Sequence, residues 1–188
     1  NHTITYQASF TSTEDNEKIG LFEIVSGTIT NLNLDANITV SGTNAQVKVG
    51  LLCGQLEDGG TIEFCDVTGN INSTAKAGGS GNASTGLIIG NSFGDLQYCT
   101  GHGNVTGVGY VGGLVGSMGN IIDNCQASYT PLIKGCYFTG NVTANNSNSL
   151  AELGGQVGEY IQTKSYGGGI CGTMRAPAVI DLCVAEAI

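Results

Sequence analysis

The sequence predicts an all-β protein, a right-handed parallel β-helix (β-solenoid) of about five to six coils. Two observations predict this fold: an eleven-residue pattern recurs four times, and a five-residue glycine motif recurs beside it. Self-similarity at a spacing of roughly 30 residues is typical of solenoids, whose repeats bury their apolar faces only against neighbouring repeats. The right hand follows from the rule for β-crossover-β connections. We expect a single domain over residues 1–188.

The eleven-residue pattern occupies residues 28–38, 61–71, 95–105 and 132–142. Its three apolar columns are expected to point inward: Ile29, Ile62, Leu96 and Ile133; Leu32, Cys65, Cys99 and Cys136; and Ile38, Ile71, Val105 and Val142. A fourth column contains only asparagine, each after a small residue: Asn37, Asn70, Asn104 and Asn141. We expect these side chains to form a hydrogen-bonded ladder along a corner, where Asn also tolerates left-handed backbone.

The glycine motif G-x-x-x-G occupies residues 50–54, 86–90, 112–116, 154–158 and 168–172. Each copy encloses an apolar pair, and short apolar runs bounded by Gly and Asn are typical of buried strands. Glycine at both ends allows positive φ, so the chain can turn a corner there. Each coil is therefore predicted to contain a strand, a corner, a strand, a corner and a strand.

Four segments interrupt the repeats. Residues 72–84 and 145–149 are small and polar, which predicts loops at corners. Residues 123–131 are predicted to be an inserted half-coil, because Ile122–Cys125 and Ile133–Cys136 share the pattern I-x-x-C. Residues 159–166 separate two glycine motifs that are too close for a full coil, so we expect an excursion or hairpin there.

Several of these segments resemble GLUG-motif repeats: Tyr110–Gly116 with Ile122–Cys125, Cys136–Val142, and the opening His2–Thr5. The resemblance covers roughly residues 19–188. It implies a secreted or surface-anchored microbial protein of the kind that includes adhesins, and it implies a scaffold rather than an activity. The chain departs from the family in its cysteine column, its uneven spacing and the missing second glycine of the first unit, after Gly20.

Composition excludes several classes of partner. The net charge is −9 and only six residues are Lys or Arg. A nucleic-acid-binding surface needs a basic stripe, so we expect no nucleic-acid partner, and anionic membranes are disfavoured for the same reason. No apolar run reaches the roughly 20 residues of a membrane-spanning helix, so no membrane insertion is expected. The sequence lacks a signal peptide and an initiator Met, which suggests a processed chain or an excised segment.

Seven cysteines allow three interpretations: core filling, disulfides or a metal site. Five share the I-x-x-C pattern, which favours a buried column of small apolar residues: Cys65, Cys99, Cys125, Cys136 and Cys183. Cys53 and Cys171 occupy the inner position of the glycine motif. Disulfides between stacked rungs remain an alternative, although an odd count prevents complete pairing. C-x-x-C and C-x-x-H spacings are absent, so neither a zinc site nor a cofactor is expected.

Seven asparagines satisfy the N-glycosylation pattern N-x-[ST]. The candidates expected in loops or at the start of the chain are Asn72, Asn82, Asn145 and Asn1. For Asn37, Asn104 and Asn141 the ladder is the favoured role, and glycosylation is the less favoured one. This density of sequons favours an extracellular or cell-surface protein.

Catalysis is not expected from the sequence. His2 and His102 lack motif neighbours, and His102, within Gly-His-Gly, is interpreted as a surface turn residue. Polysaccharide lyases and hydrolases of this fold need clustered carboxylates with a base or a cation, whereas the carboxylates here are scattered singly. A carbohydrate-active enzyme is therefore the least favoured functional class.

The chain ends favour a structural role. A solenoid that stays monomeric usually has polar caps, and neither Thr3–Tyr6 nor Ile180–Ile188 is expected to supply one. We therefore expect an extracellular structural subunit that stacks head to tail with copies of itself, or with flanking repeats of a longer chain, into a filament or surface stalk. The alternative is an adhesin or glycan-binding module, which would need an aromatic platform among the Tyr and Phe residues.

Overall fold

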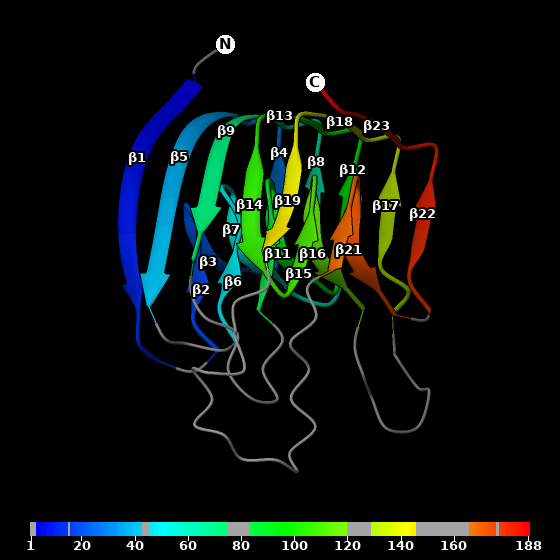
Figure 1. Ribbon diagram of the computed structural model, residues 1–188. Coiled ribbons are helices and arrows are strands. Elements are labelled where there is room, and N and C mark those ends of the chain that lie inside the picture. Colours follow the sequence, from blue (N-terminus) through cyan, green and yellow to red (C-terminus); the bar gives the residue numbers. More distant parts are fainter. Residues whose placement is uncertain are drawn as a thin grey trace.

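The computed structural model describes residues 3–14, 16–42, 46–74, 83–119, 129–145, 166–175 and 177–188. These residues form parallel strands and contain no helix, which confirms the predicted parallel β-solenoid. Strands far apart in sequence lie side by side, and the stack runs from β1 at one end to β22 and β23 at the other (Figure 1).

Four parallel sheets form the sides of the solenoid. The first contains β1 (Thr3–Ser12), β5 (Asn33–Gly42), β9 (Asp66–Ser73), β13 (Thr100–His102), β14 (Val105–Val108), β18 (Tyr137–Thr139), β19 (Val142–Asn145) and β23 (Val184–Glu186). The second contains β2 (Lys18–Ile19), β6 (Lys48–Val49), β10 (Ser84–Gly86), β15 (Tyr110–Gly112) and β20 (Tyr166–Gly168). The third contains β3 (Phe22–Val25), β7 (Cys53–Leu56), β11 (Ile89–Ser92), β16 (Val115–Met118) and β21 (Cys171–Met174). The fourth contains β4 (Thr28–Thr30), β8 (Thr61–Glu63), β12 (Asp95–Gln97), β17 (Leu132–Lys134) and β22 (Val179–Asp181).

Each coil therefore contributes strands to four sheets, whereas three strands per coil were predicted. The chain makes about 4 turns, slightly fewer than the five to six expected. Among the described residues, Val115–Met118 pairs directly with Cys171–Met174. Leu96 likewise pairs directly with Ile133.

The predicted columns of the eleven-residue pattern are in register. Ile29 pairs with Ile62, Ile62 with Leu96, Leu96 with Ile133, and Ile133 with Ile180. The column that starts at Ile38 continues through Ile71, Val105 and Val142. Alternate residues of β9 are buried and exposed, as expected for a strand with one face on the core. The inward side chains of all four sheets form one continuous hydrophobic core.

The glycine motifs differ from their predicted structure. Gly50–Leu52 forms the corner between β6 and β7, so the motif spans a corner and does not form one strand. Gly50, Gly86 and Gly112 do not have positive φ. They are required by close packing instead, because a Cβ on Gly50 would lie 2.3 Å from the carbonyl oxygen of Cys53 and 2.6 Å from that of Ile88.

The predicted loops are only partly described. Strand β9 continues to Ser73 and β10 begins at Ser84, so residues 72, 73 and 84 of the predicted 72–84 loop lie in strands. Asn145 ends β19 and Tyr166 begins β20, while Tyr129–Pro131 precede β17. The rest of segments 72–84, 123–131, 145–149 and 159–166 lies almost wholly outside the described residues. Within the part that is described, no helix is long and apolar enough to cross a membrane.

Candidate functional site

The asparagine column forms a ladder on the outer surface of the first sheet. The side-chain oxygen of Asn37 accepts hydrogen bonds from both the backbone N–H (3.1 Å) and the side-chain amide (3.0 Å) of Asn70. The same pair of bonds joins Asn70 to Asn104 and Asn104 to Asn141. Each asparagine oxygen therefore takes the place of a backbone carbonyl for the N–H of the next rung.

The glycine before each ladder asparagine has the unusual backbone. Gly69, Gly103 and Gly140 have φ of 140°, 147° and 145°, whereas the prediction had emphasised the tolerance of Asn. A Cβ on Gly103 would lie 1.6 Å from the carbonyl oxygen of Gly69. The first rung has Ala36 at this position, which shows that only the later rungs need the close approach.

Four cysteines of the predicted core column are described, and Cys125 lies outside the described residues. Cys65, Cys99 and Cys136 are buried, and Cys183 in the last coil is half-buried. Cys53 is also buried and Cys171 is half-buried; all six described cysteines are free thiols. The side chains of the column share one conformation, because each sulfur lies 3.2–3.3 Å from the carbonyl oxygen two residues before it.

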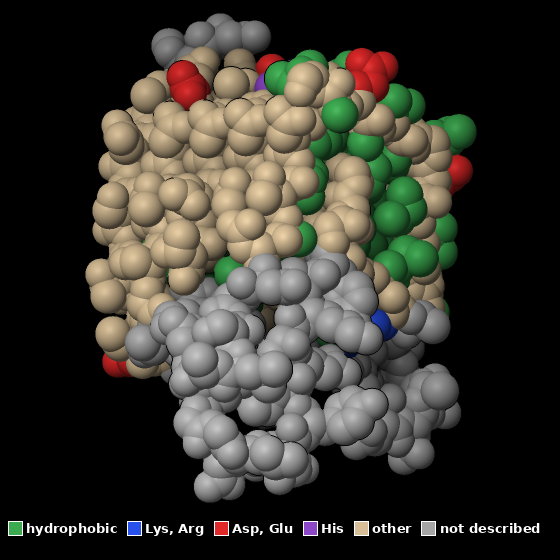
Figure 2. All heavy atoms as spheres, viewed as in Figure 1, with side chains coloured by type: hydrophobic (Ala, Val, Ile, Leu, Met, Phe, Trp, Pro, Cys, Tyr) green, Lys and Arg blue, Asp and Glu red, His purple; other side chains and the backbone are tan. Residues whose placement is uncertain are grey.

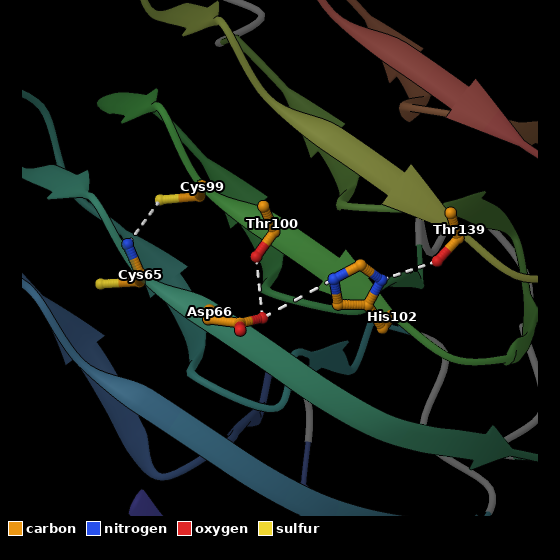
Figure 3. Close-up of polar contacts among 6 residues, drawn as sticks. All are labelled: Cys65, Asp66, Cys99, Thr100, His102 and Thr139. Atoms are coloured by element: carbon orange, nitrogen blue, oxygen red, sulfur yellow. Dashed lines mark hydrogen bonds and ion pairs between the residues drawn. The ribbon is translucent and has the colours of Figure 1, made fainter. Parts of the chain in front are cut away.

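Next to the cysteines, a polar cluster lies on the outer face of the first sheet (Figure 3). Nδ1 of His102 lies 2.7 Å from Oγ1 of Thr139, and Nε2 lies 3.9 Å from Oδ1 of Asp66. The hydroxyl of Thr100 donates to the same Asp66 oxygen at 2.7 Å. His102 lies in strand β13, so its interpretation as a turn residue is wrong.

The cluster places a hydroxyl, an imidazole and a carboxylate in one row, as in an acid–base triad. Its environment differs from that of such a site. The side chains of His102 and Asp66 are 40% and 55% exposed, so water screens both. The backbone N–H of Gly103, the nearest amide in sequence, already donates to the carbonyl of Thr139. Chemically, the cluster serves best as a hydrogen-bonded tie between the rungs of β9, β13 and β18.

A corner column of left-handed residues escaped the sequence analysis. Asn31, Phe64, Tyr98 and Leu182 have φ of 51–55°, and Gly135 at the equivalent position has φ of 61°. Left-handed backbone costs roughly 1–2 kcal/mol for a residue with a Cβ, and it is rare for bulky residues. The rings of Phe64 and Tyr98 stack with centroids 5.3 Å apart, and both rings are exposed. The sequence signal was available, since each of these residues immediately precedes the Cys column.

Basic side chains gather on the second sheet. Lys18 pairs with Lys48 in adjacent rungs, and the guanidinium of Arg175 lies 5.7 Å from the ring centre of Tyr110. Burial, with further contributions from Arg175 and Lys18, lowers the pKa of Lys48 to about 8. Half of the six cations in this acidic chain therefore lie close together.

Three of the glycan candidates of the ladder, Asn37, Asn104 and Asn141, are exposed but engaged in hydrogen bonds. Asn72 is exposed and lies in β9, not in a loop as predicted. Asn145 is exposed at the end of β19. Asn1 and Asn82 lie outside the described residues.

The two ends of the solenoid expose residues that belong to buried columns. Ile180 is 37% exposed, whereas its column neighbours Ile133 and Leu96 are 1% and 0% exposed. At the other end Ile4 is 41% exposed, whereas its neighbour Leu34 is 2% exposed. Hydrophobic side chains gather at the C-terminal end of the rod, while backbone and side chains that are neither hydrophobic nor charged cover most of the same face (Figure 2).

Comparison with known proteins adds no relative: no family model, curated protein or solved structure matches the chain.

Proposed function

We propose that this chain is an extracellular structural β-solenoid that stacks end to end, with copies of itself or with further repeats of a longer chain, into a filament or surface stalk. The exposure of Ile180 and Ile4 carries the proposal. These residues lie in columns that are buried wherever a neighbouring coil covers them, so another coil at each end would remove them from water. Burial of apolar surface contributes about 25 cal/mol per Å².

The edges of the sheets support the same assembly. Within the described residues, all four sheets are parallel and end in edge strands, from β1 to β4 at one end and from β19 to β23 at the other. Such edges are ready to pair with a further strand. Contact between the two different ends of identical subunits is heterologous and does not close, so it produces a fibre.

The extracellular setting and the absence of catalysis are part of the proposal. The resemblance to GLUG-motif repeats and the density of sequons support a secreted or surface location. The largely uncharged polar sides suit a rod that meets its neighbours only at its ends.

An adhesin or glycan-binding module is the second candidate, and the stacked Phe64 and Tyr98 rings favour it. Exposed aromatic rings that persist in strained backbone suggest a role outside folding. Isothermal titration with neutral oligosaccharides, comparing the native chain with Phe64→Ala and Tyr98→Ala, tests this alternative. Binding by the native chain that is lost in both variants would support a glycan-binding module. If the native chain gives no heat of binding, the tested oligosaccharides are excluded as ligands.

Sedimentation velocity over a range of concentrations tests end-to-end assembly. We expect the average size to grow with concentration for the native chain and to stay monomeric for Ile180→Lys, because the charge would be desolvated at the contact. Thr68→Lys is the matched control, since Thr68 is exposed on the side of the rod in a strand that is paired on both sides. Equal growth of both variants would contradict a contact at Ile180, and a native chain that stays monomeric would contradict assembly of copies and leave the stalk of a longer chain.

A further inference from the structure

The cysteine column has a geometry that packing alone does not require. The sulfur of Cys99 accepts a hydrogen bond from the backbone N–H of Cys65 at 3.4 Å, and the sulfur of Cys136 accepts one from Cys99 at 3.5 Å. The four side chains share one conformation, so equivalent sulfurs are separated by the spacing of adjacent strands, about 4.7–4.9 Å. Cys65, Cys99, Cys136 and Cys183 thus form a straight row of four sulfurs.

Backbone amides favour negative charge on two sulfurs of the row, because the N–H groups of Cys65 and Cys99 are directed at the sulfurs of Cys99 and Cys136. Backbone N–H groups that point at sulfur are also a feature of metal–thiolate sites, where they tune the bound ion.

We propose that adjacent sulfurs of this column bind a soft monovalent ion, Cu(I) or Ag(I), in linear two-coordinate geometry. Thiolates are the ligands that select Cu(I). Metal–sulfur bonds are about 2.3 Å long for zinc, and two bonds of that length placed end to end span about 4.6 Å, close to the strand spacing. Cys65 pairs with Cys99 and Cys136 pairs with Cys183, so the chain holds one ion per pair.

The binding step is a proton exchange. One ion and two thiols give an anionic dithiolate complex and release two protons, so affinity rises with pH. No electron is transferred. Cys183 is half-buried at the open end of the column, which gives an ion a route of entry.

Other outcomes for these thiols fit the geometry less well. A disulfide needs Cβ atoms about 3.8 Å apart, whereas equivalent Cβ atoms in adjacent rungs are separated by the strand spacing. A tetrahedral zinc site needs four ligands, and the described residues contain no group of three or more His, Cys, Asp or Glu that could hold a metal. The spacings C-x-x-C and C-x-x-H place metal ligands within one segment, whereas these ligands come from successive coils.

Native mass spectrometry and thermal melting with Ag(I), on reduced protein without oxygen, test the site. All forms carry Cys125→Ala, since that residue lies outside the described structure. We expect the parent, which carries only this substitution, to retain two silver ions and to melt at a higher temperature with silver than without it. Cys99→Ala with Cys183→Ala removes one sulfur from each pair, and it should retain none and show no shift.

Cys53→Ala with Cys171→Ala is the matched control and should behave like the parent, because neither residue belongs to the column. If the alanine pair does not fold, Cys99→Val with Cys183→Val replaces it, as Leu32 fills this column in the first coil. Equal silver binding by both double variants would overturn the proposal. The proposal would also be overturned if the parent retained no silver ion and showed no shift in melting temperature. The cysteines would then serve only to fill the core.

Discussion

Asn70 occupies the middle of the asparagine ladder, where it donates two hydrogen bonds to Asn37 and accepts two from Asn104. Since a typical hydrogen bond contributes a net 0.5–1.5 kcal/mol and these are exposed, Asn70→Ala should lower the free energy of unfolding by about 1–3 kcal/mol. Urea denaturation measures this. Asn72→Ala, an exposed asparagine of the same strand, should change it by less than about 0.5 kcal/mol. Equal losses would mean that the ladder is not stabilising.

Gly103 combines positive φ with a backbone approach that leaves no room for a Cβ. Gly103→Ala should destabilise the protein by at least about 2 kcal/mol, because the rungs must separate to admit the methyl group. Gly27→Ala is the control, since a Cβ there meets nothing within 4 Å. Thermal melting compares the two, and a Gly103→Ala protein as stable as the control would contradict the described corner.

Lys48 gives the fold a dependence on pH. Its pKa is about 8 in the folded chain and about 10.4 when unfolded, so the unfolded state binds more protons between these values. Stability should therefore rise as pH increases through this window. Urea unfolding at pH 7.5 to 10 measures this increase. The free energy of unfolding of Lys48→Met should not increase with pH in this way, whereas that of Lys134→Met should increase as in the native chain. If the native chain gains no more stability than Lys48→Met over this range, the pH dependence does not come from Lys48.

At the scale of the strand, alternation across β9 decides which substitutions are tolerated. Ile71 points into the core and the next residue, Asn72, points to solvent. Ile71→Asp would bury an unpaired charge and should prevent folding, whereas Asn72→Asp should fold with native circular dichroism. If Ile71→Asp folds normally, the register of this strand is displaced by one residue, since such a shift exchanges the two faces.

The elements that sequence could predict are those whose pattern repeats. The columns that begin at Ile29 and Ile38 were identified because parallel rungs place equivalent residues side by side. The four-sided cross-section was missed because strands such as β6 have only two residues, too few for a period to appear. The role of Gly50 was also missed, since close approach depends on the carbonyl of Ile88 in another coil.

The candidate sites follow the same rule. Asp66 and Thr100 occupy one column of the repeat, and His102 and Thr139 occupy another, so their meeting was implicit in the alignment of the repeats. The distances between these side chains could not be obtained from that alignment. The repeats place Phe64 and Tyr98 at equivalent positions before the Cys column, but their left-handed backbone could not be predicted, because local sequence gives no reason for bulky residues to adopt it.

For the whole molecule, the two terminal coils matter more to the proposed stacking than any single residue. Hydrogen bonds join the rungs along the sides, while the terminal coils expose apolar side chains such as Ile4 and Ile180. Figure 2 shows hydrophobic side chains gathered at the C-terminal end of the viewed face. In the proposed assembly a further coil at each end, from another copy or from a longer chain, would cover these groups.

Electron microscopy of the purified native protein, with fibre diffraction of aligned material, tests end-to-end assembly most directly. The proposal predicts unbranched filaments as wide as one solenoid, with a reflection along the fibre axis near 4.7–4.8 Å from strands stacked perpendicular to it. Short rods of uniform length at all concentrations, with no axial reflection, would contradict end-to-end assembly of copies and leave the surface stalk of a longer chain or the adhesin module.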